Sequence, residues 1–467
     1  MPKYEYSPLK LPNSTRMLCL MPDQDKTAAI RCKLFEYPLG DGSGSHLYEA
    51  LSYVWGSEKK PRSIYIDGKE LHVTKSLYAA LVHLRNHYFD RILWVDAICI
   101  NQEDNTQEKE NQIKSMTKNI LPSQSEALEF LRATAEDGIS SREYVEIGSD
   151  DSNYNPCMAL IQRPWFERIW VLQEAGVAGD IRIMCGPVDI DGSVFCSGLN
   201  RLKLSNKGYP DFENRIRSVA YLIKRAPFQP KYGHASSNRH SIGELMDMYH
   251  AHKATKLHDK IYALLNMSFD SPDELLPDYE LPWDVLFRRL VKHILFQEVE
   301  VGTWQDREVA VIKSKGYCLG RVEGVEYDDV QHDIQHVDIV CNQAAGILGL
   351  KTPKYKATSD IPYWNQAGAF ATKWTLQASA KPIQKGDILC LLHGASKPCI
   401  IRAGENCFDI IMIAVSPQYD DSRETLDLRD QAYSALIGVP PRNLLLLWNW
   451  QTGGEQRKAN ESATKDR

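Results

Sequence analysis

Trp170 and Glu174 are the two side chains of this sequence whose types and spacing best suit catalysis. They lie four residues apart in the segment RIWVLQE (168–174), which predicts a helix. Four residues make about one helical turn, so the indole ring and the carboxylate share one helical face. Glu174 is therefore a candidate catalytic carboxylate. A structural explanation stays open, in which Trp170 packs in the core and Glu174 is a solvated charge.

The segment ALSYVWG (50–56) is an apolar run that stops at a small residue. Buried parallel strands end in this way when they deliver side chains to a pocket. Gly56 permits a close approach of the backbone to a ligand, and Tyr53 or Trp55 can stack on a base or a nicotinamide ring. We therefore interpret this segment as a strand followed by a ligand-binding loop.

A second apolar run, LWVDAICINQ (93–102), ends in polar residues. The end of a strand can present Asp96 to ribose hydroxyls, as acidic residues do in other nucleotide folds. Asn101 and Gln102 can cap the next helix or bind a ligand. It is equally consistent with the sequence that these polar residues satisfy one another at a domain joint.

The elements that must position these residues follow from periodicity. Asp67-Gly68 predicts the turn of a hairpin over residues 63–73. Thr74 can cap a helix whose buried face carries leucines at 77, 81 and 84. A strand is expected over Leu93–Ile100. Strand, helix and strand in this order indicate a parallel α/β sheet with a right-handed crossover.

The three segments together, in this order and with their tryptophans, resemble the motifs of the fungal HET (heterokaryon incompatibility) domain. The resemblance covers about residues 48–175. HET domains are thought to be distant relatives of TIR domains, so it implies a TIR-like, flavodoxin-like parallel sheet. By analogy with the Trp-x-x-x-Glu helix of TIR domains, Glu174 would be the catalytic residue of NAD cleavage, with NAD as a substrate and no bound cofactor. The residues that would bind NAD are Tyr53, Trp55, Gly56, Asp96, Asn101, Gln102 and Trp170.

The resemblance also implies a biological role. HET proteins act in fungal non-self recognition, in which contact between incompatible strains triggers programmed cell death. The expected partners are proteins of the incompatibility system, with self-association. The alternative is a non-catalytic signalling and oligomerisation module that recruits partners, and a family member that has lost its function is a third reading.

The sequence departs from the family pattern near Ile120. Relatives carry an apolar strand ending in Trp-Leu-Gly at this junction, and this chain has only Ile120-Leu121-Pro122-Ser123 there. We therefore expect a sheet that lacks one strand, with an unpaired edge or a gap beside Leu93–Ile100. Unpaired strand edges favour aggregation.

Five regions are expected along the chain. Two strands near residues 16–20 and 29–34 lead into the HET domain, a mainly helical region follows it, and the last third is β-rich with a hairpin over 386–402. The tail is polar and is predicted to be disordered. The boundaries are 1–47, 48–175, 176–300, 301–450 and 451–467.

Composition restricts the class of protein. A formal net charge of -6 gives no electrostatic footprint for binding nucleic acid. Eleven cysteines, an odd number without a Cys-x-x-Cys pair, suit reduced thiols inside the cell. No apolar run approaches the roughly 20 residues of a membrane-spanning helix. A cytoplasmic protein is expected.

No metal site is expected from the histidines. His332 and His336 have the spacing of a zinc-protease helix, but an aspartate stands where the general base should be a glutamate. A surface helix or loop is the better interpretation there. His250, His252 and His258 lack flanking cysteines or acidic residues at useful spacing, and solvent-facing side chains are expected.

Overall fold

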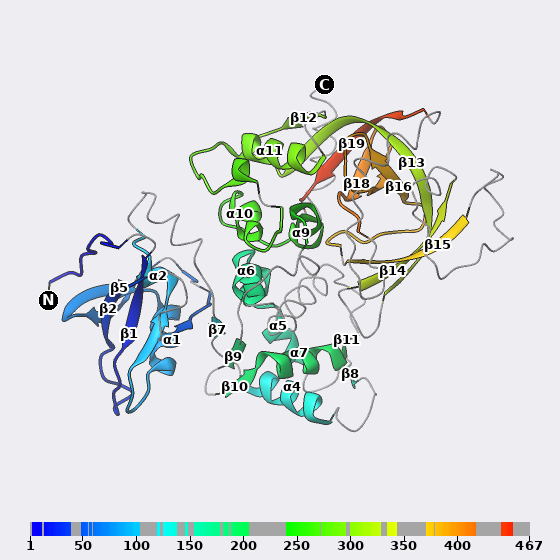
Figure 1. Cartoon of the computed structure of the whole chain (residues 1–467). Coiled ribbons are helices and arrows are strands. Elements are labelled where there is room, and N and C mark those ends of the chain that lie inside the picture. Colours follow the sequence, from blue (N-terminus) through cyan, green and yellow to red (C-terminus); the bar gives the residue numbers. More distant parts are fainter. Residues whose placement is uncertain are drawn as a thin grey trace. The chain divides into compact units, whose positions relative to one another are not determined.

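The computed structural model divides the chain into two compact units, of which the first covers the described residues up to 204 and the second those from 240 onward. Figure 1 shows the elements of each unit along the sequence. The residues that the structure describes are 2–11, 14–38, 48–54, 56–57, 59–102, 119–121, 125–137, 145–147, 154–177, 181–185, 188–204, 240–270, 272–295, 299–327, 334–342, 370–377, 379–416 and 440–451.

The first unit is built on a six-stranded mixed sheet with the order β3-β6-β1-β2-β4-β5. The strands are β1 (Ser14–Leu20), β2 (Arg31–Pro38), β3 (Glu49–Ala50), β4 (Arg62–Ile66), β5 (Lys69–Val73) and β6 (Arg91–Trp94). Only β3 with β6 and β2 with β4 pair in parallel. The mixed α/β class is as expected, but the expected parallel sheet is wrong, because β1 enters the centre of the sheet antiparallel to both β2 and β6.

The hairpin and the helix that follow β3 form as the sequence predicts. Asp67 and Gly68 both have positive φ, 51° and 78°, as the two-residue turn between β4 and β5 requires. Helix α1 (Lys75–Leu84) begins at Thr74, whose hydroxyl accepts a hydrogen bond from Leu77 N at 3.2 Å. Strand, helix and strand in sequence therefore give the parallel pair β3 and β6.

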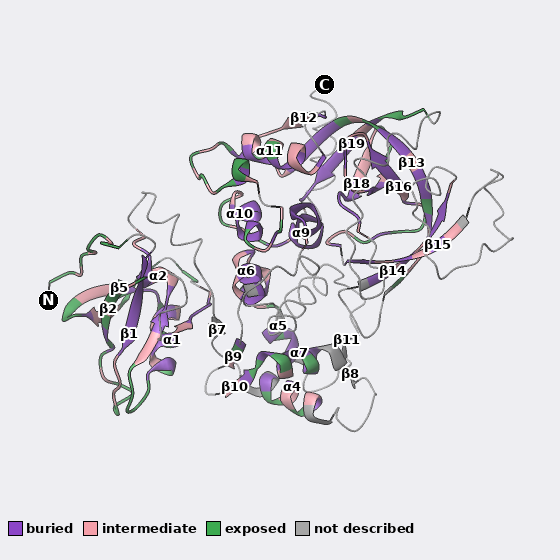
Figure 2. Cartoon of the chain, in the orientation of Figure 1, coloured by how far each residue is buried: buried purple, intermediate pink, exposed green. Residues whose placement is uncertain are grey.

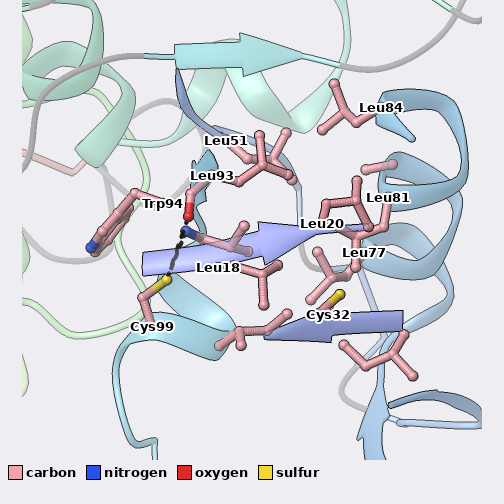
Figure 3. Packing of buried hydrophobic residues seen from close by; sticks show 14 of the residues in the cluster. Leu18, Leu20, Cys32, Leu51, Leu77, Leu81, Leu84, Leu93, Trp94 and Cys99 are labelled. Atoms are coloured by element: carbon pink, nitrogen blue, oxygen red, sulfur yellow. Dashed lines mark hydrogen bonds between the residues drawn. The ribbon is translucent and has the colours of Figure 1, made fainter. Parts of the chain in front are cut away.

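The core of this unit lies between α1 and the strands. Figure 3 shows Leu77, Leu81 and Leu84 of α1 directed towards Leu18 and Leu20 of β1. All five side chains are at most 2% exposed. Burial of such side chains contributes roughly 1.5–3 kcal/mol each. This packing holds the edge of the sheet from which the first two motifs emerge.

The strand expected over Leu93–Ile100 is shorter than predicted. β6 ends at Trp94, and Asp96–Cys99 form one helical turn, α2. Cys99 Sγ accepts a hydrogen bond from Val95 N at 3.3 Å, and its thiol is within 4.0 Å of the Leu93 carbonyl oxygen (Figure 3). Ile98 and Cys99 of α2 are buried by packing of the helical turn and not by pairing in a strand. An apolar run in the sequence does not distinguish these two kinds of burial.

The predicted gap beside Leu93–Ile100 is also wrong. β6 lies between β3 and β1 and so has a partner on each side. A short strand, β7 (Asn119–Leu121), does form near Ile120, but it pairs in parallel with β9 (Ile181–Cys185). These two strands and β10 (Val188–Asp191) form a separate sheet of order β10-β9-β7. The amino-terminal strand β1 takes the place beside β6 that the prediction left empty.

Helices make up most of the rest of the first unit. Its remaining elements are α4 (Ser125–Asp137), β8 (Val145–Ile147), α5 (Tyr154–Ile161), the 3-10 helix η1 (Pro164–Glu167), α6 (Trp170–Val177), β10 (Val188–Asp191), α7 (Gly192–Arg201) and β11 (Leu202–Leu204). Gly198 in α7 packs so closely on α4 that an added Cβ would lie 2.4 Å from the Leu131 carbonyl oxygen. A glycine is therefore required at this crossing.

The second unit begins with helices. They are α9 (Ile242–Tyr249), α10 (Asp259–Leu265), the 3-10 helix η4 (Asp273–Leu275) and α11 (Trp283–Leu295). Every residue of α9 is buried (Figure 2). Asp247 of this helix accepts hydrogen bonds from Ile413 N and Ala414 N at 2.8 and 2.9 Å, which fixes α9 against the β-strands of the unit. Burial raises the pKa of Asp247 to about 8.

The histidines near α9 do not face solvent, contrary to expectation. His250 and His252 are 2% and 1% exposed. Their Nδ1 atoms lie 2.8 and 3.2 Å from the backbone carbonyl oxygens of Met246 and Tyr249. A ring nitrogen that is paired with a backbone carbonyl is buried at a lower cost than an unpaired one, and the sequence spacing carries no sign of such a pairing.

Eight strands complete the second unit. They are β12 (Glu300–Thr303), β13 (Val309–Tyr327), β14 (Ile334–Cys341), β15 (Phe370–Gln377), β16 (Ile388–Leu392), β17 (Cys399–Ala403), β18 (Phe408–Met412) and β19 (Arg442–Asn449). β13, β16, β17, β18 and β19 pair in turn, and β19 pairs again with β13, so these strands close a small barrel. The hairpin predicted over 386–402 is confirmed as β16 and β17.

The described residues also bear on two further expectations, one about the pair His332 and His336 and one about membrane-spanning helices. His336 lies in β14, not in a helix, and its Nδ1 is 3.0 Å from Thr375 Oγ1. His332 lies outside the described residues. Among the helices of the described residues, none has the length and apolar character needed to cross a membrane.

Candidate functional site

The first two motifs leave the sheet at the same end. β3 and β6 run parallel, and Leu51 N, just after β3, donates a hydrogen bond to the Trp94 carbonyl oxygen at 2.9 Å. Ser52 and Tyr53 follow β3, and Asp96 follows β6. Because the carboxyl ends of parallel neighbours meet at one edge, these residues emerge side by side.

The third motif contacts this edge through Glu174. Ser52 donates its hydroxyl hydrogen to Glu174 Oε2. The same hydroxyl oxygen accepts a hydrogen bond from Trp165 Nε1 at 2.8 Å. Ser52 and Trp165 are 3% and 4% exposed, whereas Glu174 is partly buried. Ser52 thus connects the loop after β3 with both η1 and α6.

A second contact fixes the same loop. Arg168, between η1 and α6, donates from Nη1 to the Tyr53 carbonyl oxygen at 2.6 Å. Arg168 and Glu174 of the third motif therefore bind Tyr53 and Ser52, two consecutive residues of the first motif. We infer that these hydrogen bonds set the position of α6, and with it that of the Glu174 carboxylate, relative to the sheet edge.

Tyr53 brings the second motif into the same neighbourhood. Its ring is 1% exposed, and its phenol oxygen has no hydrogen-bond partner within the part of the chain that the structure describes. Burial first, and the nearby negative charge of Asp96 second, raise the pKa of Tyr53, while Arg168 acts in the opposite direction. The phenol is therefore a neutral buried donor with Asp96 near it.

The remaining predicted residues have local roles in the structure. Gln102 Nε2 donates to the Asp96 carbonyl oxygen at 2.9 Å, which closes the end of α2. Asp96 Oδ1 accepts a hydrogen bond from Ala97 N at 2.6 Å. Asn101 is partly buried directly after α2. Gln102 thus binds the helical turn that precedes it, whereas the helix it was expected to cap lies outside the described residues. The ligand-binding interpretation of Asp96, Asn101 and Gln102 stays a prediction.

Gly56 and Trp55 belong to the loop after Tyr53. Gly56 has a φ of +69°, and an added Cβ would lie 3.0 Å from Ser76 Oγ of α1. The turn itself therefore requires glycine, whether or not a ligand approaches. Trp55 lies outside the described residues.

The helix predicted for the third motif is confirmed as α6, which begins at Trp170 and includes Glu174 one turn later. Trp170 is only partly buried, which favours the site role of this ring over the alternative in which it packs in the core. The core ring is instead that of Trp165, which packs edge to face on Phe166 with centroids 4.9 Å apart. The sequence contained a signal for it, since an aromatic pair stands just before the third motif.

We expect Ser52→Ala to destabilise the junction between the loop after β3 and α6. The substitution leaves the buried Trp165 Nε1 without its acceptor, at a cost of about 1–3 kcal/mol. Hydrogen exchange of α6 amides measures the local stability, and Ser57→Ala, an exposed serine of the same loop, should change it by less than about 0.5 kcal/mol. Equal exchange in the two variants would mean that Ser52 does not hold this junction.

Comparisons with known proteins agree with the motif pattern. Residues 48–174 match the family model described as "Heterokaryon incompatibility protein (HET)". The chain is similar to "Heterokaryon incompatibility protein 6, OR allele" of Neurospora crassa, with 24% identity over 337 residues that cover 56% of this chain and 49% of the relative. The chain thus spans about half the length of that relative. No solved structure matches the chain.

The match to the family begins just before β3 and ends at Glu174. It therefore includes Ser52, Tyr53, Asp96, Trp165 and Arg168, the residues whose contacts and charges connect the three motifs. Sequence motifs, structural contacts and family match coincide over the same segment. Residues 48–174 of the chain therefore match the heterokaryon incompatibility (HET) family in sequence and hold the contacts that join the three motifs.

Proposed function

We propose that this protein acts in fungal heterokaryon incompatibility and that its HET domain cleaves NAD with Glu174 as the catalytic residue. The role in incompatibility is supported by the family match and by the similar Neurospora crassa protein. In this proposal the protein acts in the cytoplasm, associates with further copies of itself and with protein partners of the incompatibility system, and triggers cell death by depleting NAD.

The chemistry requires one carboxylate at the nicotinamide ribose. The bond between ribose C1′ and the pyridinium nitrogen breaks, and its electron pair leaves with neutral nicotinamide. The remaining oxocarbenium ion is stabilised by the negative charge of Glu174. Water then adds to C1′ and releases one proton, which gives ADP-ribose. Because the leaving group is already a good one, no general acid is needed.

The observation that carries the proposal is the hydrogen bond between Ser52 and Glu174. It joins the first and third HET motifs at a carboxylate that is partly buried and therefore still reachable. Trp165 Nε1 holds the serine from its other side at 2.8 Å. A carboxylate fixed in this way requires little reorganisation when positive charge develops next to it.

In the proposed complex with NAD, the other site residues bind the substrate. Asp96, after β6, is suited to the ribose hydroxyls. Trp170 lies one turn from Glu174 on α6 and is partly exposed, so it can stack on a ring of the substrate. Tyr53, Trp55, Gly56, Asn101 and Gln102 would form the surrounding loops.

The same contact also favours a second function. A carboxylate that accepts the hydrogen bond of a buried serine can be a structural link between α6 and the sheet. The HET domain would then be a non-catalytic module that oligomerises and recruits partners. The two functions differ in whether NAD is consumed.

The test uses the purified full-length chain, free and artificially clustered on a multivalent scaffold, incubated with NAD. We expect the clustered protein to release nicotinamide and ADP-ribose in equal amounts, as chromatography would show. Complete absence of turnover in clustered protein that is folded by circular dichroism would exclude the enzymatic proposal. The recruitment module would then be the better account.

A further inference from the structure

A cavity of about 790 Å³ lies on the β-barrel of the second unit, and neither the family match nor the proposed NAD chemistry assigns a role to it. Its lining includes Glu300, Lys313, Lys315, Tyr317, His393 and Asn443. We propose that this cavity binds a small phosphate ester of nucleotide size. The proposal concerns the second unit only and does not rest on Glu174.

The strand register brings the polar lining residues to one face. Lys313, Lys315 and Tyr317 alternate along β13, so their side chains share a side of the sheet. Glu300 of β12 is the partner of Lys313, and Asn443 of β19 is the partner of Lys315. Lys313, Lys315 and Asn443 are exposed, so this is the solvent side.

The charges of this face favour an anion. Lys313 Nζ forms an ion pair with Glu300 Oε1 at 3.2 Å, so the two charges offset one another. Lys315 is exposed and has no ion pair with any residue that the structure describes. One ammonium group is therefore left for a ligand, beside the imidazole of His393 and the amide of Asn443. Ammonium and amide groups are suitable donors to phosphate oxygens.

The rest of the cavity suits the organic part of such a ligand. Tyr317 is 9% exposed, lies on the same face as the two lysines and lines the cavity. An aromatic ring next to cationic groups matches a molecule with a flat apolar part and a phosphate. The volume lies within the roughly 300–1,000 Å³ range of small-molecule pockets.

The pairing of β13 argues against a peptide ligand. At Lys313–Tyr317, β13 pairs with β19 on one edge and with β12 and β16 on the other. His393 N also donates to the Lys315 carbonyl oxygen at 2.7 Å. β13 therefore has no free edge here to which a peptide strand could add. The formal net charge of -6 likewise disfavours a long polyanion.

Binding of a fluorescent ATP analogue to the full-length chain, followed by polarisation, tests the proposal. We expect saturable binding that unlabelled ATP reverses and adenosine does not. Lys315→Ala should weaken binding by about tenfold, because it removes the unpaired charge. Lys313→Ala should weaken binding less, since Glu300 already offsets that charge. Lys385→Ala, a control lysine paired with Glu323 at 3.0 Å outside the cavity, should bind like the wild type.

Glu300→Gln separates binding from folding. It frees Lys313 and removes a negative charge, so the affinity for the ATP analogue should rise, whereas a folding defect lowers affinity. Three results would overturn the proposal: no saturable binding at about 1 mM ligand, equal binding by Lys315→Ala and Lys385→Ala, or much tighter binding of a short single-stranded oligonucleotide than of ATP.

Discussion

Glu174→Gln is expected to lower NAD cleavage by about 10²–10³-fold, the loss typical when one electrostatic stabiliser of a transition state is removed. Glutamine keeps the shape of the side chain and can still accept the hydrogen bond from Ser52, so α6 should remain in place. What is lost is the negative charge that stabilises the oxocarbenium ion. The measurement is nicotinamide release by clustered protein, with the thermal unfolding midpoint as the check on folding.

Glu167→Gln is a matched control for this variant. Glu167 is a partly buried carboxylate at the end of η1, seven residues before Glu174. The substitution removes one negative charge from the same part of the domain, so the rate should stay within a few-fold of the wild type. Unchanged activity in Glu174→Gln would exclude the catalytic role.

Lys397→Met is expected to destabilise the second unit by about 3 kcal/mol, the lower end of the usual cost when a buried charge loses a partner, because His240 still faces Glu244. Lys397 Nζ lies 2.9 Å from Glu244 Oε2, and the two side chains are 11% and 6% exposed. Glu244 also accepts a hydrogen bond from Ser241 N at 2.7 Å in the capping box of α9. Pulse proteolysis in urea measures the change. Lys385→Met, which breaks an exposed pair with Glu323, should cost less than about 1 kcal/mol.

The contribution of this ion pair depends on pH. Burial alone would raise the pKa of Glu244, but the hydrogen bond and charge of His240 and the charge of Lys397 outweigh it and hold the pKa well below its usual value. A lowered folded-state pKa stabilises the protein above the unfolded-state pKa of about 4.3, and this stabilisation is lost as pH falls further. The difference between wild type and Lys397→Met should therefore shrink below that pH. A difference in unfolding free energy between wild type and Lys397→Met that stays constant from pH 7 to about pH 3 would contradict the assignment of this stability to the charge of Glu244.

The sequence predicts local elements well where side-chain chemistry decides them. The turn at Asp67-Gly68, the Thr74 cap and the buried face of α1 each follow from a few adjacent residues, and the structure confirms them. The parallel pairing of β3 and β6 follows from strand, helix and strand in order. These features depend on contacts close in sequence.

Features that depend on distant contacts were beyond the sequence. Nothing in residues 14–20 indicates that β1 would pair antiparallel with β6 and fill the expected gap. The short helical turn after Trp94 looks like a strand because its apolar residues are buried in either case.

The candidate site was foreseen as three motifs but not as a set of contacts. Glu174 and its helix were predicted, whereas Ser52, Trp165 and Arg168, which connect the motifs, were not. A serine between apolar neighbours has no periodic signature. Its partners, Trp165 and Glu174, lie 113 and 122 residues further along the chain. Such hydrogen bonds become visible only when the fold brings the segments together.

The most direct test of the central claim is the NAD content of living fungal cells that express this chain under an inducible promoter. We predict that NAD falls before viability is lost in cells with the wild-type chain. Cells with equal amounts of Glu174→Gln should keep both NAD and viability. Cell death with unchanged NAD, or equal killing by Glu174→Gln, would contradict the account.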